Sequence, residues 1–82
     1  MTYYVYLIIS KIKKKTISYV GYTKDLKKRL ILHNSGKGAK FTRGRLWKLV
    51  YSKKYRSKTI AMKEEYKLKK NLKLRNIIKS NA

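Results

Sequence analysis

The run Tyr3-Tyr4-Val5-Tyr6-Leu7-Ile8-Ile9-Ser10 decides the fold class, together with the next apolar run, Thr16-Ile17-Ser18-Tyr19-Val20-Gly21-Tyr22. Both runs are rich in β-branched and aromatic residues, which favour extended chain in a partly buried sheet. Residues 11–15 between them contain four lysines, a composition typical of an exposed turn. We therefore predict a β-hairpin with strands at residues 3–10 and 16–22.

A helix is predicted after the hairpin. Thr23 is a candidate N-cap, and Asp25 lies in the first turn, where a negative charge suits the helix dipole. Leu26, Leu30 and His33 fall on one side of this helix. Gly36 is its expected end, because glycine readily adopts the left-handed conformation that closes many helices.

The remaining chain predicts a short third strand at residues 47–51 and two more helices. Ser57 or Thr59 caps a helix that runs to about Lys70, and a third helix covers residues 72–79. The order β-β-α-β-α-α indicates an α/β fold, a small three-stranded antiparallel sheet flanked by helices. Eighty-two residues is about half of the roughly 150 expected per domain. We therefore predict a single domain over residues 1–82, with its core at about 2–75 and the last few residues disordered.

The composition points to a polyanionic partner. Twenty-four Lys and Arg residues oppose three acids, which gives a net charge of +21. Self-repulsion on this scale opposes a compact fold, and a nucleic acid would relieve it. An AT-rich coding sequence would also enrich lysine, so part of the charge has this second explanation. The 43% hydrophobic content excludes a charged disordered tail, and the absence of cysteine excludes disulfides, thiol catalysis and Cys-ligated zinc.

The chain carries no segment typical of a membrane protein. Its longest apolar run, residues 5–9 (or 3–9 with the leading tyrosines), is far shorter than the roughly 20 residues that span a bilayer. The first residues lack the basic segment of a signal peptide. We expect no membrane partner and a cytoplasmic location.

Glu65 is the acid that points to function. On the second predicted helix it lies in the middle of the apolar stripe, between Ala61 and Leu68 on one side and Met62 on the other, whereas Glu64 lies at the edge. A carboxylate in such a place is unfavourable unless it is paired or coordinates a metal. A structural pair with a buried Arg and a functional role are both open on helix geometry alone.

Arg29 and His33 share a ridge of the first helix, because they are four residues apart. Arginine holds phosphates bidentately, and histidine transfers protons near neutral pH. The spacing alone favours a plainer interpretation, in which Arg29 pairs with Asp25 and His33 caps the helix end.

Residues 34–45 form a glycine-rich basic segment that is predicted to be an exposed loop. It lacks the spacing of a Walker phosphate loop and follows a helix rather than a strand. Contact with nucleic-acid phosphates explains it better. The residues expected to bind nucleic acid are Lys37, Lys40, Arg43 and Arg45.

These residues together resemble the GIY-YIG nuclease superfamily. Tyr4-Val5-Tyr6 and Tyr19-Val20-Gly21 match its paired motif, with Tyr4 where the family name has Gly. Arg29, His33 and the Glu of the segment 61–66 follow in the family's order. The segment 33–45 is similar to small stand-alone bacterial members, and the resemblance covers residues 2 to 75. Asn71 and Asn76 do not align with the Asn of larger members.

The resemblance implies a catalytic role for each matched residue. Tyr6 matches the general base that activates the attacking water, and Tyr19 helps to order the site. Arg29 stabilises charge on the phosphate, and His33 assists proton transfer. Glu65 is the expected anchor of one divalent ion, Mg²⁺ or Mn²⁺, which suits an ion that keeps waters and uses substrate phosphate as a ligand.

The implied function is metal-dependent endonuclease activity on DNA, structure-selective or weakly specific, in DNA repair or processing. DNA is the expected partner, and RNA is left open. No small-molecule cofactor is expected, and the chain is expected to be a monomer or a weak homodimer. The alternative is a nucleic-acid-binding protein that keeps the nuclease fold and cleaves little. The charge favours binding, and the joint presence of Tyr6, Arg29 and Glu65 favours catalysis.

Overall fold

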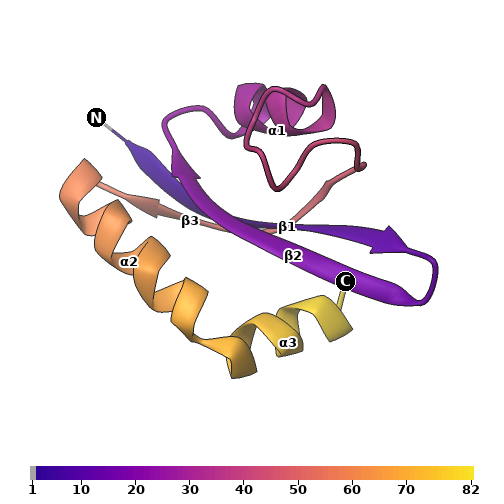
Figure 1. Cartoon of the computed structure of the whole chain (residues 1–82). Coiled ribbons are helices and arrows are strands. Elements are labelled where there is room, and N and C mark those ends of the chain that lie inside the picture. The colour runs from indigo at the N-terminus through magenta and orange to yellow at the C-terminus, as the bar shows by residue number, and fades with distance from the viewer. Residues whose placement is uncertain (1) are drawn as a thin grey trace.

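The first apolar run forms the central strand of the sheet. In the computed structural model, which describes residues 2–82, β1 (Tyr3–Ile12) pairs with β2 (Lys15–Thr23) on one side and β3 (Lys48–Tyr55) on the other. Both pairings are antiparallel, and the strand order is β2-β1-β3 (Figure 1). The predicted α/β class and the order β-β-α-β-α-α are confirmed.

The hairpin is longer than the sequence predicts. Strand pairing continues through Lys11 with Thr16 and Ile12 with Lys15, so the chain reverses within two residues. Lys13 permits this with a positive φ of 56°. The prediction of a five-residue turn was wrong because the end of this hairpin is exposed and needs no apolar side chains to pair its backbone.

The sheet separates two layers of helix (Figure 1). Successive side chains of a strand point to opposite faces, so Val5 and Leu7 pack toward α2 (Lys58–Lys70) and α3 (Leu72–Ser80). Tyr6 and Ile8 pack on the other face with α1 (Leu26–Asn34) and Trp47. None of the helices within residues 2–82 has the length and apolar character needed to cross a membrane.

Asp25 is the N-cap of α1, so the prediction of Thr23 was wrong. The Asp25 carboxylate accepts a hydrogen bond from the backbone N–H of Lys28 at 3.0 Å. Thr23 still belongs to β2, and its hydroxyl accepts from the N–H of Asp25 at 3.2 Å. Gly36 closes the helix as predicted: its φ is +78°, and its N–H donates to the carbonyl of His33 at 3.3 Å.

The other boundaries follow from caps and from an exposed edge. Ser57 caps α2 by accepting from the N–H of Ile60 at 3.2 Å, and Asn71 starts α3 by accepting from the N–H of Leu74 at 3.0 Å. β3 extends to Tyr55, beyond the predicted residue 51, because the polar Ser52, Lys53 and Lys54 are tolerated on an exposed edge strand. α3 runs to Ser80, and disorder of the last few residues stays a prediction.

Candidate active site

Four of the predicted catalytic residues line one open pocket of about 350 Å³ at the edge of the sheet. The pocket is lined by Tyr6, Tyr19, Gly21, Tyr22, Thr23, Arg29 and Glu65. Glu65 comes from the helix layer opposite to α1, and it reaches the pocket because β2 is an edge strand. The sheet edge is thus the place where both layers contribute side chains to one site.

Tyr6 is buried and connects two of the other residues. Its Oη lies 2.7 Å from His33 Nε2, and Arg29 Nε donates to the same oxygen at 3.4 Å. Burial raises the pKa of Tyr6 above 10.0, and the hydrogen bond and charge of Arg29 oppose that rise without cancelling it. The hydroxyl is therefore protonated at neutral pH and has a bonded partner to which a proton can move.

Gly21 makes room for the Tyr6 ring. The two residues are directly opposite each other in the β1–β2 ladder. A Cβ on Gly21 would lie 2.7 Å from Tyr6 Cζ and would overlap the hydroxyl oxygen. No residue with a side chain fits here unless Tyr6 moves, which explains the glycine of Tyr19-Val20-Gly21 in physical terms.

We expect Gly21→Ala to displace the Tyr6 hydroxyl and to lower any cleavage by about tenfold or more, since misplacement of a reacting group by an ångström is costly. Thermal melts should show destabilisation as well. The same change in a Tyr6→Leu background should destabilise the fold less, because the ring end is gone. Equal destabilisation in both backgrounds would show that the overlap with Tyr6 is not the cause.

His33 is fully buried and fixed on both sides of its ring. Its Nδ1 lies 2.9 Å from Thr42 Oγ1, and the backbone of Gly38 packs so closely that a Cβ there would be 2.8 Å from His33 Cγ. Neither ring nitrogen bonds to the helix end, so the interpretation of His33 as a simple cap is not supported. Sequence reasoning missed Thr42. The available signal was an uncharged hydroxyl residue inside the basic loop.

The hydrogen bonds of Thr42 assign the tautomer of His33. Its hydroxyl lies 2.9 Å from the carbonyl oxygen of Ala39, a contact that requires the hydroxyl proton to lie between the two oxygens. The same oxygen accepts from the N–H of Ala39 at 3.1 Å. Its remaining lone pair accepts from His33, so we assign the proton to Nδ1. His33 Nε2 is then the acceptor, and Tyr6 donates to it.

The electrostatics of His33 agree with this assignment. Burial lowers the pKa of His33 below 6.5, and the Arg29 guanidinium lowers it further. The ring is therefore neutral at pH 7, with Nε2 free to take a proton from Tyr6.

Glu65 is mostly buried, with a side chain that is 16% exposed and an oxygen 3.3 Å from Lys69 Nζ. Its partner is thus a lysine one turn along the helix, and the alternative of a structural pair with a buried Arg is not found. Arg29 contacts Tyr6, while the Asp25 carboxylate caps α1, so the alternative pairing of Arg29 with Asp25 is not found. Both plainer interpretations of these residues are therefore unsupported.

The donors in the pocket fit one partly hydrated divalent ion. Residues 2–82 contain no group of three acidic, His or Cys side chains that would form a metal cage, and Glu65 is the acid that lines the pocket. Mg²⁺ commonly binds through one or two carboxylates with waters and a substrate phosphate. Glu65 is suited to that arrangement and not to a metal held by protein ligands alone.

The basic loop lies beside this pocket and does not line it. Lys37, Lys40 and Arg43 are exposed, while Arg45 is half-buried with its guanidinium 5.4 Å from the centre of the Phe41 ring. The loop also supplies Gly38, Ala39 and Thr42 around His33. Nucleic-acid binding by the four cations stays a prediction, and the loop has a second task in holding His33.

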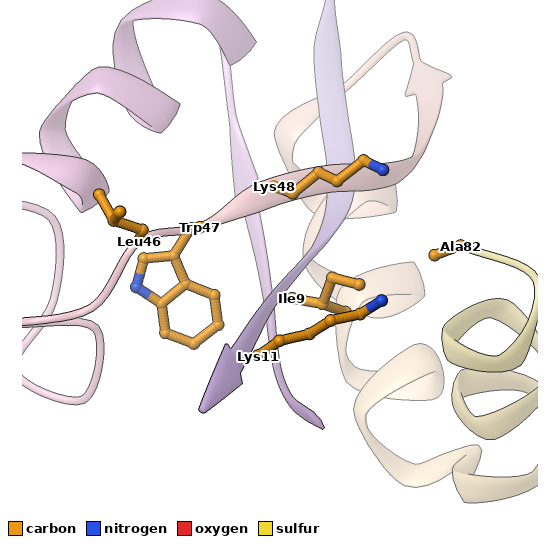
Figure 2. A pocket seen from close by; sticks show the side chains of 6 residues that line it. All are labelled: Ile9, Lys11, Leu46, Trp47, Lys48 and Ala82. Carbon is orange, nitrogen blue, oxygen red and sulfur yellow. The ribbon is translucent and has the colours of Figure 1, made fainter. Parts of the chain in front are cut away.

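A separate, mostly apolar pocket has a volume of about 270 Å³ and lies beside the Trp47 ring. It is lined by Ile9, Lys11, Leu46, Trp47, Lys48 and Ala82 (Figure 2). None of the predicted site residues lines it. In Figure 2 the ring nitrogen of Trp47 points away from Ile9 and Lys11, and it donates to the carbonyl of Thr42 at 2.9 Å. Trp47 therefore supports the loop that holds His33.

The chain is similar to one family of catalytic domains and to several bacterial proteins. A model of the GIY-YIG catalytic domain matches residues 2–77. A UPF0213 protein of Streptococcus pneumoniae serotype 4 is 55% identical over 53 residues, which are 63% of this chain but only 54%, about half, of that protein. UPF0213 protein OB0043 of Oceanobacillus iheyensis is 44% identical over 68 residues, 82% of this chain and 76% of its own. The solution NMR structure of UPF0213 protein BH0048 from Bacillus halodurans has a TM-score of 0.53 and 40% identity, and the match covers 98% of this chain and 84% of that one.

Proposed function

Because this chain belongs to the GIY-YIG catalytic domain family, we propose that it is a metal-dependent endonuclease that hydrolyses phosphodiester bonds of DNA. The family is one of nucleases, which act on nucleic acid and generally depend on a metal. The net charge of +21 supports a polyanionic substrate. DNA as the substrate, and repair or processing as the setting, are parts of the proposal.

One observation carries the proposal: a base, a cation and a carboxylate from three different elements meet at one open pocket. Tyr6 comes from β1, Arg29 from α1 and Glu65 from α2. Binding a polyanion requires cations and no carboxylate, so a mostly buried Glu65 among them favours catalysis. A phosphate in this pocket would have the Arg29 guanidinium on one side and the Tyr6 hydroxyl within reach of a water.

The hydrogen bonds define a route for the proton of the attacking water. The water oxygen forms the new P–O bond while its proton passes to Tyr6 Oη, and the Tyr6 proton passes to His33 Nε2 along the 2.7 Å hydrogen bond. The opposite P–O bond breaks, and the leaving oxygen takes a proton from solvent. Tyr6 never has to exist as a free tyrosinate, which its raised pKa disfavours.

Two residues stabilise charge in this scheme. Arg29 offsets the negative charge that develops on the phosphate oxygens. Glu65 would hold Mg²⁺ or Mn²⁺ together with the substrate phosphate, and such an ion supplies Lewis-acid polarisation of the phosphoryl oxygen and stabilisation of the leaving group. Since Lys69 now neutralises Glu65, the lysine must release the carboxylate for this role.

A second candidate function is nucleic-acid binding without efficient cleavage. The specific observation in its favour is the charge, because neutralising several phosphates gives salt-dependent affinity whatever the sequence. This candidate uses the same surface and leaves the Tyr6–His33 network without a task.

Cleavage of a labelled panel decides between the two candidates. The panel holds single-stranded, duplex, flapped and branched DNA with matched RNA strands, each with Mg²⁺, with Mn²⁺ and with a chelator. We expect metal-dependent cutting of at least one DNA substrate. Tight, salt-sensitive binding without cutting of any substrate would favour the binding protein, and preferential cutting of RNA would overturn the assignment of DNA.

The tautomer of His33 gives a prediction that needs no activity. His33 is the single histidine of the chain, so its ring signals are unambiguous in long-range ¹H–¹⁵N NMR spectra. We expect the proton on Nδ1 and a titration midpoint below 6.5, in line with the lowered pKa. Thr42→Val should remove this preference, and Thr42→Ser should retain it. An Nε2–H ring in the unaltered protein would contradict the assignment.

The same pKa makes stability depend on pH in a definite direction. The folded state binds the His33 proton less readily than the unfolded chain does. The neutral His33 ring therefore contributes to the free energy of unfolding, and this contribution is fully present above pH 6.5. It decreases as the pH falls from 6.5 to the lowered pKa of the folded state, because the unfolded chain takes up a proton first.

A further inference from the structure

A second pocket lies directly beside the candidate active site. It has a volume of about 390 Å³ and is lined by Ser18, Tyr19, Val20, Phe41, Lys69 and Arg75. Tyr19 lines both pockets, and the Glu65–Lys69 ion pair joins an acid of the first pocket to a cation of the second. A strand with one phosphate at the active site would therefore place a neighbouring nucleotide here.

Phe41 gives this pocket an aromatic wall. Its ring is held by three neighbours: Tyr19 at a centroid distance of 6.1 Å and an interplanar angle of 21°, Trp47 at 6.3 Å, and Arg45. Despite these contacts Phe41 remains 52% exposed. Large aromatic side chains are usually well buried, so a fixed and half-exposed ring at the edge of a cationic pocket is suited to stacking on a base.

Arg75 gives the pocket an unused hydrogen-bond donor. Its Nε is inaccessible to solvent and has no partner among residues 2–82. The ion pairs within that range join Glu65 to Lys69 and Glu64 to Lys67, so neither carboxylate neutralises Arg75. A buried donor without a partner is unfavourable, and the guanidinium would have to turn toward the pocket for an anion bound there to satisfy it. A phosphate is the anion that a nucleic-acid strand supplies.

We propose that the pocket formed by Phe41, Lys69 and Arg75 binds one unpaired nucleotide of the substrate strand next to the scissile phosphate. The base stacks on Phe41, and the phosphate pairs with Arg75 and with Lys69 once Glu65 releases it. This inference rests on the proposed endonuclease function and extends it to substrate choice. It combines Phe41 of the basic loop with Lys69 of α2 and Arg75 of α3, none of which is among the four loop cations that the sequence assigned to binding.

The stacking requirement explains why the nucleotide is unpaired. In a duplex both faces of a base are covered by its neighbours, so an aromatic side chain reaches only a base that has left the stack. The volume of about 390 Å³ lies near the lower end of the roughly 300–1,000 Å³ of small-ligand sites. That size is sufficient for one nucleotide.

The test measures DNA affinity in a chelating buffer, where cleavage does not occur. Fluorescence anisotropy compares an oligothymidylate strand with a blunt hairpin duplex of the same phosphate number. We expect Phe41→Leu to lower the ratio of single-strand to duplex affinity by about tenfold. Arg75→Gln should weaken strand binding and reduce the slope of log affinity against log salt by about one. An unchanged ratio in Phe41→Leu would overturn the proposal.

Two control variants separate this pocket from general effects. Leu46→Ala removes an apolar side chain that is 81% exposed and does not line the pocket, and it should leave both affinities unchanged. Arg43→Gln removes an exposed cation of the basic loop and should weaken both probes alike. A strand-selective loss in Arg43→Gln and none in Arg75→Gln would place the phosphate of the nucleotide at Arg43 and overturn the proposal.

Photocrosslinking locates the base directly. A strand that carries iododeoxyuridine should crosslink to the peptide containing Phe41, and crosslinks confined to other peptides would contradict the stacking. A matched RNA strand bound more tightly, with the same dependence on Phe41, would overturn DNA as the ligand. Binding is measured without a divalent ion, so its outcome is independent of the cleavage assay. Phe41-dependent binding by a protein that does not cleave would support this pocket and contradict the endonuclease proposal. Cleavage without Phe41-dependent binding would support the endonuclease proposal and contradict this pocket.

Discussion

Glu65→Gln is expected to lower metal-dependent cleavage by about 10³-fold or more, because the pocket then loses its carboxylate. The substitution keeps the size and shape of the side chain. DNA affinity in the presence of a chelator should be equal or somewhat higher, since Lys69 is freed from its 3.3 Å ion pair and adds a cation. Single-turnover cleavage rates and anisotropy titrations measure the two quantities separately.

Glu64 offers a matched control on the same helix. It is the adjacent residue, it forms a comparable ion pair with Lys67 at 3.1 Å, and it does not line the pocket. Glu64→Gln should therefore leave the cleavage rate and its dependence on Mg²⁺ unchanged. If both substitutions lowered cleavage equally, the effect of Glu65→Gln would come from the helix and not from metal binding.

Tyr6→Phe is expected to lower the cleavage rate by about 10²–10⁴-fold, the usual contribution of a positioned general base. The change removes one oxygen, and with it the hydrogen bonds to His33 and Arg29. The phenylalanine ring fills the same space, so the fold should persist. The loss should appear in the rate at saturating substrate and not in DNA affinity, because the hydroxyl acts on the water and not on the strand.

Tyr4 gives the control for this prediction, because it lies two residues before Tyr6 on the same face of β1 and does not line the pocket. Tyr4→Phe should cleave at the rate of the unaltered protein. A Tyr6→Phe variant that kept full activity would exclude Tyr6 as the base. NMR spectra of His33 in Tyr6→Phe test the hydrogen bond independently, since loss of the donor should shift the Nε2 signal.

Much of the fold could be predicted because its signals are local. The β-branched and aromatic runs, the Ser57 cap and the Gly36 helix end each depend on a few neighbouring residues. The strand ends could not be predicted, because Lys11 and Lys53 are polar residues in backbone pairing that other strands complete. The sequence indicated Thr23 as the N-cap and Asp25 as a first-turn residue, but β2 continues through Thr23 and Asp25 becomes the cap.

The candidate site was partly predictable for a different reason. Tyr6, Arg29, His33 and Glu65 could be named from the order of motifs along the chain, and they do gather at one place. Thr42 could not, because its importance depends on lying 2.9 Å from His33 Nδ1, nine residues away along the chain. Helix geometry also left the partner of Glu65 open, and the structure shows that Glu65 forms an ion pair with Lys69.

By itself the sequence determined the class of fold, the order of the elements, the strongly cationic character of the chain and the side chains available for chemistry. These properties follow from composition and from periodicity over short stretches. The tertiary structure alone decided which atoms meet: the partners of the two ring nitrogens of His33, the space over Gly21, and the pocket where Phe41 and Arg75 lie beside the candidate active site. The physical reason is that hydrogen bonds and close contacts act over a few ångströms, and only folding brings residues distant in sequence within that range.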